Sequence, residues 1–155
     1  MNHDFLIWIS GAGLLLTLAW LASIDLETYR LPNKITMPLI AGGLLYHFIM
    51  SLDSYPYLLG AVLGYAIFWT VETGYRLIRK RDGLGRGDAK LLAAGGAWCG
   101  AMALPFIILM ASSAALIVVL MKPKSERATL KLAFGPYLAG AIAIIFIAMR
   151  MTGNF

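Results

Sequence analysis

Two aspartates occupy corresponding places in the chain, each beside one end of an apolar run. Asp25 directly follows the first apolar run, residues 5–24, and Asp88 closes the segment Gly85-Arg86-Gly87-Asp88, just before another apolar run begins at Leu91. Carboxyl groups held about 3 Å apart cannot both ionise, so one stays charged while the other keeps its proton. The charged carboxylate takes a proton from water, and the protonated one donates to a carbonyl oxygen. This is the pairing that an aspartic protease needs, and it makes Asp25 and Asp88 the candidate catalytic residues.

Each aspartate taken alone also has a purely structural interpretation. Asp88 fits an N-terminal helix cap, where hydrogen bonding and the helix dipole favour a carboxylate. Asp25 fits an interfacial charge with a basic residue of the following loop as its partner. The glycines before Asp88 add weight to a functional role, because glycine takes positive φ without steric cost and lets the backbone approach a substrate strand. We therefore expect Gly85 and Gly87 to shape a loop beside the site.

The composition indicates a membrane protein. Hydrophobic residues make up 60% of the 155 residues and charged residues only 14%, whereas a soluble domain carries about a quarter charged residues. The length leaves room for a single membrane-embedded domain, residues 1–155. Cys99 is the one cysteine in the sequence, which excludes an internal disulfide and a zinc ribbon. His47, alone in an apolar run, is expected to be packed rather than to bind a metal, and we expect neither a metal site nor a cofactor.

Uncharged runs predict the membrane-spanning helices. A span needs about 20 residues, and a helix over residues 91–121 would be about 46 Å long against a hydrocarbon core of about 30 Å. Gly100 and Pro105 offer a place to turn within that run. The first run lacks a small-x-small cleavage site, so we expect it to be retained. The predicted fold is all-α, a polytopic membrane protein with six transmembrane helices near residues 5–24, 35–52, 55–71, 89–103, 105–121 and 132–149.

The distribution of basic residues supports six spans and predicts their orientation. The loops after spans one, three and five hold 12 of the 13 lysine and arginine residues, and only Arg150 lies on the other side. Positively charged loops stay in the cytoplasm. Both termini are therefore expected on the non-cytoplasmic side, with Asp25 and Asp88 at the cytoplasmic face. The basic cluster at residues 76–81 fits this topogenic role and lipid headgroups, and we expect membrane lipids but no nucleic acid as partners.

Three sequence blocks, read together, resemble one known family. Residues 23–33 (SIDLETYRLPN), residues 83–100 (GLGRGDAKLLAAGGAWCG) and residues 134–139 (FGPYLA) look like blocks of the bacterial type IV prepilin peptidases, in the same order. The resemblance implies a membrane aspartic protease of the GxGD class with Asp25 and Asp88 as its catalytic pair. It also implies a multi-pass protein of the bacterial inner membrane that serves a type IV pilus or type II secretion. Its substrates would be prepilins or pseudopilins, cleaved after a short basic leader at the cytoplasmic face.

Further site residues follow from these blocks and from charge. Lys90 lies in the second block, and Gly135 and Pro136 lie in the third; we expect them to bind substrate or to shape loops. A basic leader calls for acidic residues nearby, and Glu27 is one candidate, together with Glu72 and Asp82.

One departure from the family and one alternative function accompany this prediction. Many family members carry an N-terminal cytoplasmic region with paired Cys-x-x-Cys motifs and also methylate the new N-terminus. This sequence contains no such motif, so we expect a short form without that region, and the sequence does not determine whether methylation is retained. The alternative is a non-catalytic membrane subunit or a small transporter of a secretion or pilus assembly. A transporter would place charge near the bilayer midplane, whereas the acidic residues here lie near predicted span ends or in loops. The sequence does not determine the oligomeric state.

Overall fold

The computed structural model describes residues 3–50, 53–79, 85–123 and 132–152. These residues form six α-helices and one short 3-10 helix, which confirms the all-α prediction for the described part of the chain. The elements are α1 (His3–Thr28), α2 (Asn33–Met50), α3 (Tyr55–Arg79), α4 (Arg86–Cys99), η1 (Ala101–Ala103), α5 (Leu104–Met121) and α7 (Gly135–Thr152).

Three segments of these helices are long and apolar enough to cross a membrane. They are Trp8–Thr28, Ala101–Met121 and Gly135–Thr152. Many large apolar side chains on these helices are exposed, among them Leu16, Phe106 and Ile144. An apolar exterior of this kind suits lipid rather than water, and the protein is a membrane protein.

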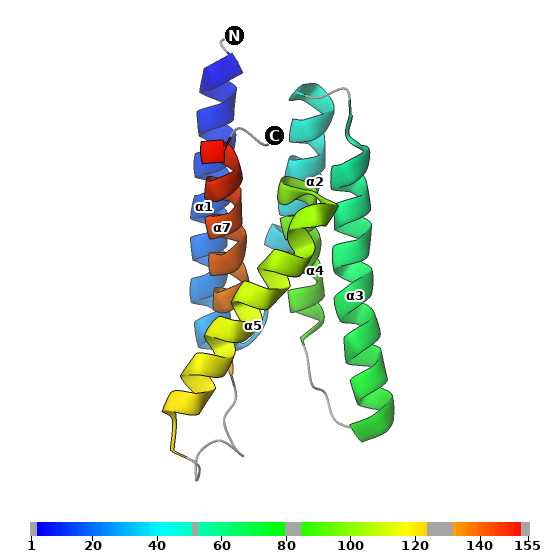
Figure 1. Cartoon of the computed structure of the whole chain (residues 1–155), viewed down its shortest axis with the longest axis vertical. Coiled ribbons are helices and arrows are strands. Elements are labelled where there is room, and N and C mark those ends of the chain that lie inside the picture. Colours follow the sequence, from blue (N-terminus) through cyan, green and yellow to red (C-terminus); the bar gives the residue numbers. More distant parts are fainter. Residues whose placement is uncertain (1–2, 51–52, 80–84, 124–131, 153–155) are drawn as a thin grey trace.

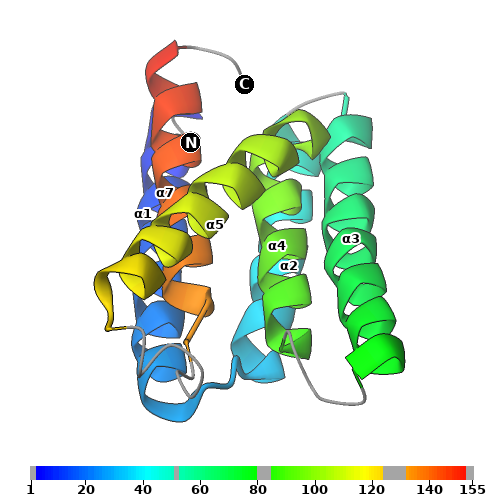
Figure 2. The ribbon, with the colours of Figure 1, turned by 60° about the horizontal axis from the view of Figure 1, so that its bottom comes forward.

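The helices alternate in direction along one long axis (Figure 1). The start of α1 and the end of α7 lie at the same end of the bundle. At the opposite end, α1 ends and α2, α4 and α7 begin; we call this the site end (Figures 1 and 2). Helices α1 and α7 lie side by side, α2, α3 and α4 form a second group, and α5 crosses obliquely between the two groups.

Helix α4 is the most buried element, with every residue from Asp88 to Cys99 buried except Lys90. Its small side chains bring the backbone of α3 unusually close. A Cβ atom built on Gly96 would lie 2.1 Å from the carbonyl oxygen of Gly60, and one on Gly64 would lie 2.7 Å from that of Leu92. Glycines spaced four apart, as at 60 and 64, are a familiar means of close helix packing in membranes. Direct backbone contact therefore holds the helix that carries Asp88 against α3.

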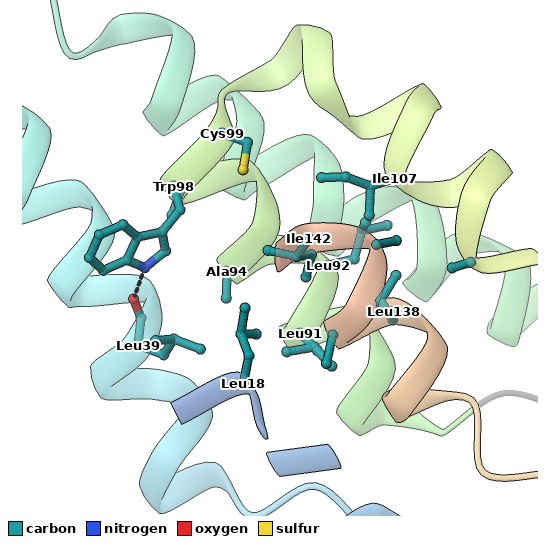
Figure 3. Packing of buried hydrophobic residues seen from close by; sticks show 14 of the residues in the cluster. Leu18, Leu39, Leu91, Leu92, Ala94, Trp98, Cys99, Ile107, Leu138 and Ile142 are labelled. Atoms are coloured by element: carbon teal, nitrogen blue, oxygen red, sulfur yellow. Dashed lines mark hydrogen bonds between the residues drawn. The ribbon is translucent and has the colours of Figure 1, made fainter. Parts of the chain in front are cut away.

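The other faces of α4 pack against leucine, isoleucine and aromatic side chains (Figure 3). Leu91 and Leu92 are fully buried and meet a cluster that includes Ile107 of α5 and Ile142 of α7. The indole Nε1–H of Trp98 donates to the carbonyl oxygen of Leu39 at 2.9 Å, which links α4 to α2. This satisfies the polar atom of a buried ring, as burial requires.

His47 is packed, as expected. It is 3% exposed, its Nε2 lies 3.2 Å from the carbonyl oxygen of Trp98, and its ring stacks on that of Tyr57 with centroids 3.3 Å apart. Within the described residues, no group of three or more His, Cys, Asp or Glu side chains is placed to hold a metal ion.

The predicted break within residues 91–121 is confirmed at Gly100. This glycine has φ 81°, a left-handed conformation that glycine adopts at little cost, and η1 and Pro105 of α5 follow it. The predicted boundaries differ elsewhere. Helix α1 continues to Thr28, beyond the apolar run that ends at residue 24, so Asp25 lies inside a helix rather than after it. A helix ends where its backbone hydrogen bonding ends, which need not be where the chain becomes polar.

Candidate active site

Asp25 lies in the last turns of α1 and faces the beginning of α7. Its side chain is 4% exposed, and its Oδ2 accepts a hydrogen bond from the backbone N–H of Gly135 at 2.9 Å. In the first turn of α7, Pro136 has no N–H, and the N–H groups of Tyr137 and Leu138 both bond to Phe134. The Gly135 N–H is thus the spare donor of this turn. A carboxylate at a helix N-terminus is also favoured by the helix dipole, so α7 both orients Asp25 and stabilises its charged form.

The contact with Asp25 requires glycine at position 135. A Cβ atom there would lie 2.6 Å from Oδ2 and 2.9 Å from Cγ of Asp25. Pro136, the second residue of the helix, has the φ angle that starts a helix. The third sequence block therefore meets the first: Gly135 contacts Asp25, while Pro136 shapes the helix start and is not among the residues that line the pocket described below.

Asp88 is the third residue of α4 and is 8% exposed. Its backbone N–H donates to the carbonyl oxygen of Gly85 at 3.0 Å. Burial and, to a smaller extent, the nearby charge of Asp25 raise the pKa of Asp88 to about 7. Near neutral pH this carboxyl group is therefore protonated in about half of the molecules, whereas an ordinary aspartate would be almost fully ionised.

Gly85 and Gly87, the two glycines before Asp88, do not adopt the positive φ that their sequence pattern suggested. Gly85 has φ −72°, and among the described glycines only Gly100 has positive φ. Gly87 is needed for close packing, because a Cβ atom on it would lie 2.7 Å from Cβ of Leu31. Its role is to bring the start of α4 against the turn that follows α1, and so to bring Asp88 toward Asp25.

Both aspartates line one pocket of about 410 Å³ at the site end. Of the predicted site residues, Gly85, Gly87 and Lys90 line it too, and Gly135 lies behind Asp25. The full lining is Asp25, Tyr29, Arg30, Leu31, Asn33, Gly85, Arg86, Gly87, Asp88 and Lys90. Two carboxyl groups that are far apart in sequence thus open onto the same space.

The turn between α1 and α2 contributes pocket residues that sequence reasoning missed. Tyr29 has φ 52°, a left-handed conformation that costs a non-glycine residue about 1 kcal/mol or more. Its N–H caps α1 by donating to the carbonyl oxygen of Asp25 at 2.9 Å. Across the pocket, the Lys90 amine donates to Oδ1 of Asn33, which ties α4 to α2. The Leu31-Pro32 pair is a signal for the end of α1, but it does not reveal which residue caps the helix.

The acidic residues proposed to attract a basic leader are not gathered at the pocket. Glu27 is exposed and is not among the pocket-lining residues. Glu72 is buried and pairs with Arg86, with Oε1 and Nε 3.5 Å apart, so it anchors the first residue of α4 to α3. Asp82 lies outside the described residues. The charged residues that join the aspartates around the pocket are instead basic: Arg30, Arg86 and Lys90.

The fold and the pocket define a helical membrane protein with a paired-carboxylate site. Residues 12–120 match the model of the type IV leader peptidase family. The chain therefore belongs to the type IV leader peptidase family.

Individual relatives agree with the family match. The chain is 43% identical over 121 residues to the prepilin leader peptidase/N-methyltransferase of Escherichia coli, covering 77% of this chain and 54% of that protein. It is 40% identical over 154 residues to the protein of the same name from Dickeya chrysanthemi, covering 90% of this chain and 53% of that protein. Its identity to the protein of the same name from Pseudomonas aeruginosa is 38% over 151 residues, which covers 93% of this chain and 52% of that protein. The chain thus spans about half the length of the curated relatives it matches. No solved structure matches this chain.

Proposed function

We propose that this protein is a membrane aspartic endopeptidase that removes the leader peptide from type IV prepilins or pseudopilins. The observation that carries the proposal is that Asp25 and Asp88, from separate helices, are both buried and line the same pocket. The family supports the substrate class, since the relatives named above are prepilin leader peptidases. The proposal concerns the peptidase activity and does not extend to the N-methyltransferase activity that the relatives' names also include.

The two carboxyl groups have different surroundings, which suggests how they share one proton. Asp25 accepts a hydrogen bond from Gly135, an interaction that favours a charged carboxylate. Asp88 is buried beside that charge and keeps the proton. In this arrangement Asp25 takes a proton from a water molecule whose oxygen attacks the scissile carbonyl carbon, while Asp88 donates its proton to the carbonyl oxygen.

Collapse of the resulting tetrahedral intermediate completes the reaction. The C–N bond breaks, the leaving nitrogen takes the proton that Asp25 had received, and Asp88 recovers a proton from the intermediate's hydroxyl. The products are a carboxylic acid and an amine, and the pair again holds one proton. Because the two groups titrate together, each proton belongs to the pair as much as to one residue.

We further propose that all six described helices cross the bacterial inner membrane, with the site end in the cytoplasm and both termini on the other side. Basic residues support this orientation. Four basic residues lie in or beside the elements of the site end: Arg30, Lys34, Arg86 and Lys90. Arg150 instead lies near the opposite end of the molecule, in the last turn of α7. The catalytic pocket would then face the cytoplasm, where positively charged segments such as a basic leader peptide stay.

Co-expression with an epitope-tagged prepilin tests the proposed activity. The wild-type protein should shorten the substrate by the mass of its leader, and Asp25→Asn and Asp88→Asn should each abolish this cleavage without preventing membrane insertion. Asp53→Asn is a matched control, because Asp53 is exposed and lies between α2 and α3, at the end away from the site. Cleavage by both dyad variants at the wild-type rate would refute the assignment. Absence of cleavage by the wild type with several prepilins would point to a non-catalytic role.

A further inference from the structure

A large apolar hollow lies between α1 and α7, near the end of the bundle opposite the site end. Its volume is about 630 Å³, which is the size of a typical small-molecule site. Its lining includes Trp8, Ala12 and Leu15 of α1 and Phe146 and Arg150 of α7. We call it the α1–α7 hollow, because it follows the seam where these two helices lie side by side (Figures 1 and 2). Its described lining shares no residue with that of the catalytic pocket.

Arg150 is the one charged residue among the described residues that line this hollow. It is also the exception to the distribution of basic residues, because the other 12 lysines and arginines lie in the loops that are predicted to be cytoplasmic. A charged side chain in an apolar segment is costly, and it usually has a partner or a function. The proposed peptidase activity gives Arg150 no role, because the contact with Asp25 is at the other end of α7.

Side chains of α2 and α7 hold the guanidinium group of Arg150. Its Nη2 donates to the hydroxyl oxygen of Tyr46 at 2.7 Å. Its central carbon lies 5.6 Å from the centroid of the Tyr46 ring and 5.3 Å from that of Phe146, where the face of an aromatic ring attracts a cation. A guanidinium group carries five N–H donors in a rigid fork that matches phosphate oxygens. Arg150 is half-buried, so it is oriented by these contacts and still borders the hollow.

The hollow extends from the level of the membrane interface into the apolar region. Trp8 begins the segment of α1 that is apolar enough to cross a membrane, and Arg150 lies in the last turn of the corresponding segment of α7. Tryptophan and arginine at the ends of such segments lie at the level of lipid headgroups. From Trp8 to Leu15 the α1 wall continues for seven positions, or about 10 Å. The hollow therefore has a positive charge at its interfacial end and apolar walls below it.

We propose that the α1–α7 hollow binds one anionic phospholipid, with the phosphate at Arg150 and part of an acyl chain between α1 and α7. A lipid is favoured over a soluble anion because the remaining walls are apolar and Ala12 and Ile147 are exposed on the outer surface of the bundle. A headgroup with a net negative charge is favoured over a zwitterionic one. None of the described lining residues is acidic, so a headgroup amine would find no partner there and would meet the charge of Arg150.

This inference requires only that α1 and α7 lie in a membrane, and it does not rest on the proposed peptidase activity. Arg150 also has a purely structural interpretation. A cation in the last turn of a helix is stabilised by the helix dipole, and the bond to Tyr46 links α7 to α2. In that case Arg150→Gln would lower stability and leave lipid selectivity unchanged. The affinity for lipid is therefore the measurement that separates the two interpretations.

Two substitutions act on different parts of the site. Arg150→Gln removes the charge, and Ala12→Phe fills the apolar part, because Ala12 is exposed and lines the hollow. Ala148→Phe is the matched control, because Ala148 is an exposed residue of α7 that is not among the lining residues. Tyr46→Phe controls for the structural interpretation, because it removes the hydrogen-bond partner of Arg150 and keeps the charge.

Native mass spectrometry of the full-length chain in detergent measures Kd for phosphatidylglycerol and for zwitterionic phosphatidylcholine with identical acyl chains. We expect the wild type to bind one phosphatidylglycerol about tenfold more tightly than phosphatidylcholine, because only the former has a net charge that complements Arg150. Arg150→Gln should abolish this preference, and Ala12→Phe should weaken the binding of both lipids about tenfold. Ala148→Phe and Tyr46→Phe should keep the wild-type preference. Glycerol phosphate, which has the anionic group without the chains, should not compete.

Several outcomes would overturn the proposal. Equal affinity of the wild type for the two lipids would do so, as would a preference for phosphatidylglycerol that Arg150→Gln retains. Displacement of the lipid by glycerol phosphate would show a site for a soluble anion instead. A lipid-free dimer that Ala12→Phe dissociates would leave the hollow to a second copy of the chain.

Thermal unfolding provides a measurement that does not depend on the Arg150 variant being folded. Because a ligand that binds only the folded state raises its stability, phosphatidylglycerol should raise the melting temperature of the wild type and of Ala148→Phe. It should raise that of Ala12→Phe much less. Equal shifts in all three proteins would place the bound lipid elsewhere and contradict the proposal.

Discussion

At the scale of single residues, the hydrogen bond from Gly135 to Asp25 is a contact that substitution of the glycine would disturb directly. A methyl group at position 135 would lie 2.6 Å from the carboxylate oxygen, so Gly135→Ala must displace either the Asp25 side chain or the start of α7. Displacement of a catalytic group by about 1 Å typically costs about 100-fold in rate. We expect Gly135→Ala to lower kcat for prepilin cleavage by about 10- to 100-fold, measured by gel densitometry with purified protein.

The same helix offers the control for this prediction. Gly140→Ala adds an identical methyl group to α7, but nothing lies within 4 Å of the new atom. Its activity should equal that of the wild type, and its melting temperature should stay the same or rise slightly, because alanine favours helix. Equal activity of the two variants would show that the Asp25–Gly135 contact is not required.

Protonation of Asp88 makes both activity and stability depend on pH. Its pKa is raised from 3.8 to about 7, so the folded state binds this proton more tightly than the unfolded state. The stabilisation from this bound proton is fully present below the pKa of Asp88 in the unfolded state. It is lost as the pH rises through the pKa of Asp88 in the folded state. Cleavage should fall above about pH 7, because the pair then lacks the proton that Asp88 donates.

Measurements from about pH 5 to about pH 9 test this titration. We expect the melting temperature in detergent to decline from about pH 5 to about pH 7 and then to level off, and the decline to be smaller in Asp88→Asn, which has no proton to lose. A cleavage rate that stays constant through neutral pH, with an unchanged slope of stability in the variant, would contradict the assigned protonation.

At the scale of elements, the position of α4 depends on its backbone contact with α3. Gly96→Ala would bring a methyl carbon to 2.1 Å from the carbonyl oxygen of Gly60, and no flexible side chain is there to yield. Overpacking of this kind costs about 1–3 kcal/mol. We expect a lower melting temperature and a loss of cleavage, because α4 carries Asp88 and moves with the repacked interface.

Gly74→Ala separates this effect from general changes in α3. The added Cβ atom meets nothing within 4 Å, so the change should be neutral or slightly stabilising. Thermal unfolding of both variants in the same detergent gives the comparison. A melting temperature for Gly96→Ala equal to that of the wild type would mean that the two helices are not held by this contact.

At the scale of the whole molecule, the proposed orientation places the two ends of the bundle in different compartments. Asp53 precedes α3 at the end that carries the termini, and Lys122 follows α5 at the site end. In a Cys99→Ala background, Asp53→Cys should react with a membrane-impermeant maleimide applied to spheroplasts. Lys122→Cys should react only after permeabilisation. The reverse pattern would place the aspartates outside the cytoplasm and exclude the proposed orientation.

Some features of this protein are determined by local sequence, and these were predictable. The lengths of the apolar runs identify the helices, and Gly100 with Pro105 identifies the break between α4 and α5. The prediction that Asp25 and Asp88 lie at the same end of the bundle followed from the alternation of helix direction, which places the end of α1 and the start of α4 there (Figure 1). Each inference depends only on residues adjacent in the chain or on the count of membrane crossings.

The features that only the tertiary structure decided join residues that are distant in sequence. Asp25 and Gly135 are 110 residues apart, and the sequence does not indicate that α7 would direct its one spare N–H at this carboxylate. The contact of Gly87 with Leu31 and the approach of Gly96 to Gly60 likewise depend on which face each helix turns to its neighbour. That choice is made by the packing of all the helices together. Uniformly apolar segments carry little periodic signal of the face they bury, because side chains exposed to lipid and side chains in the core are equally apolar.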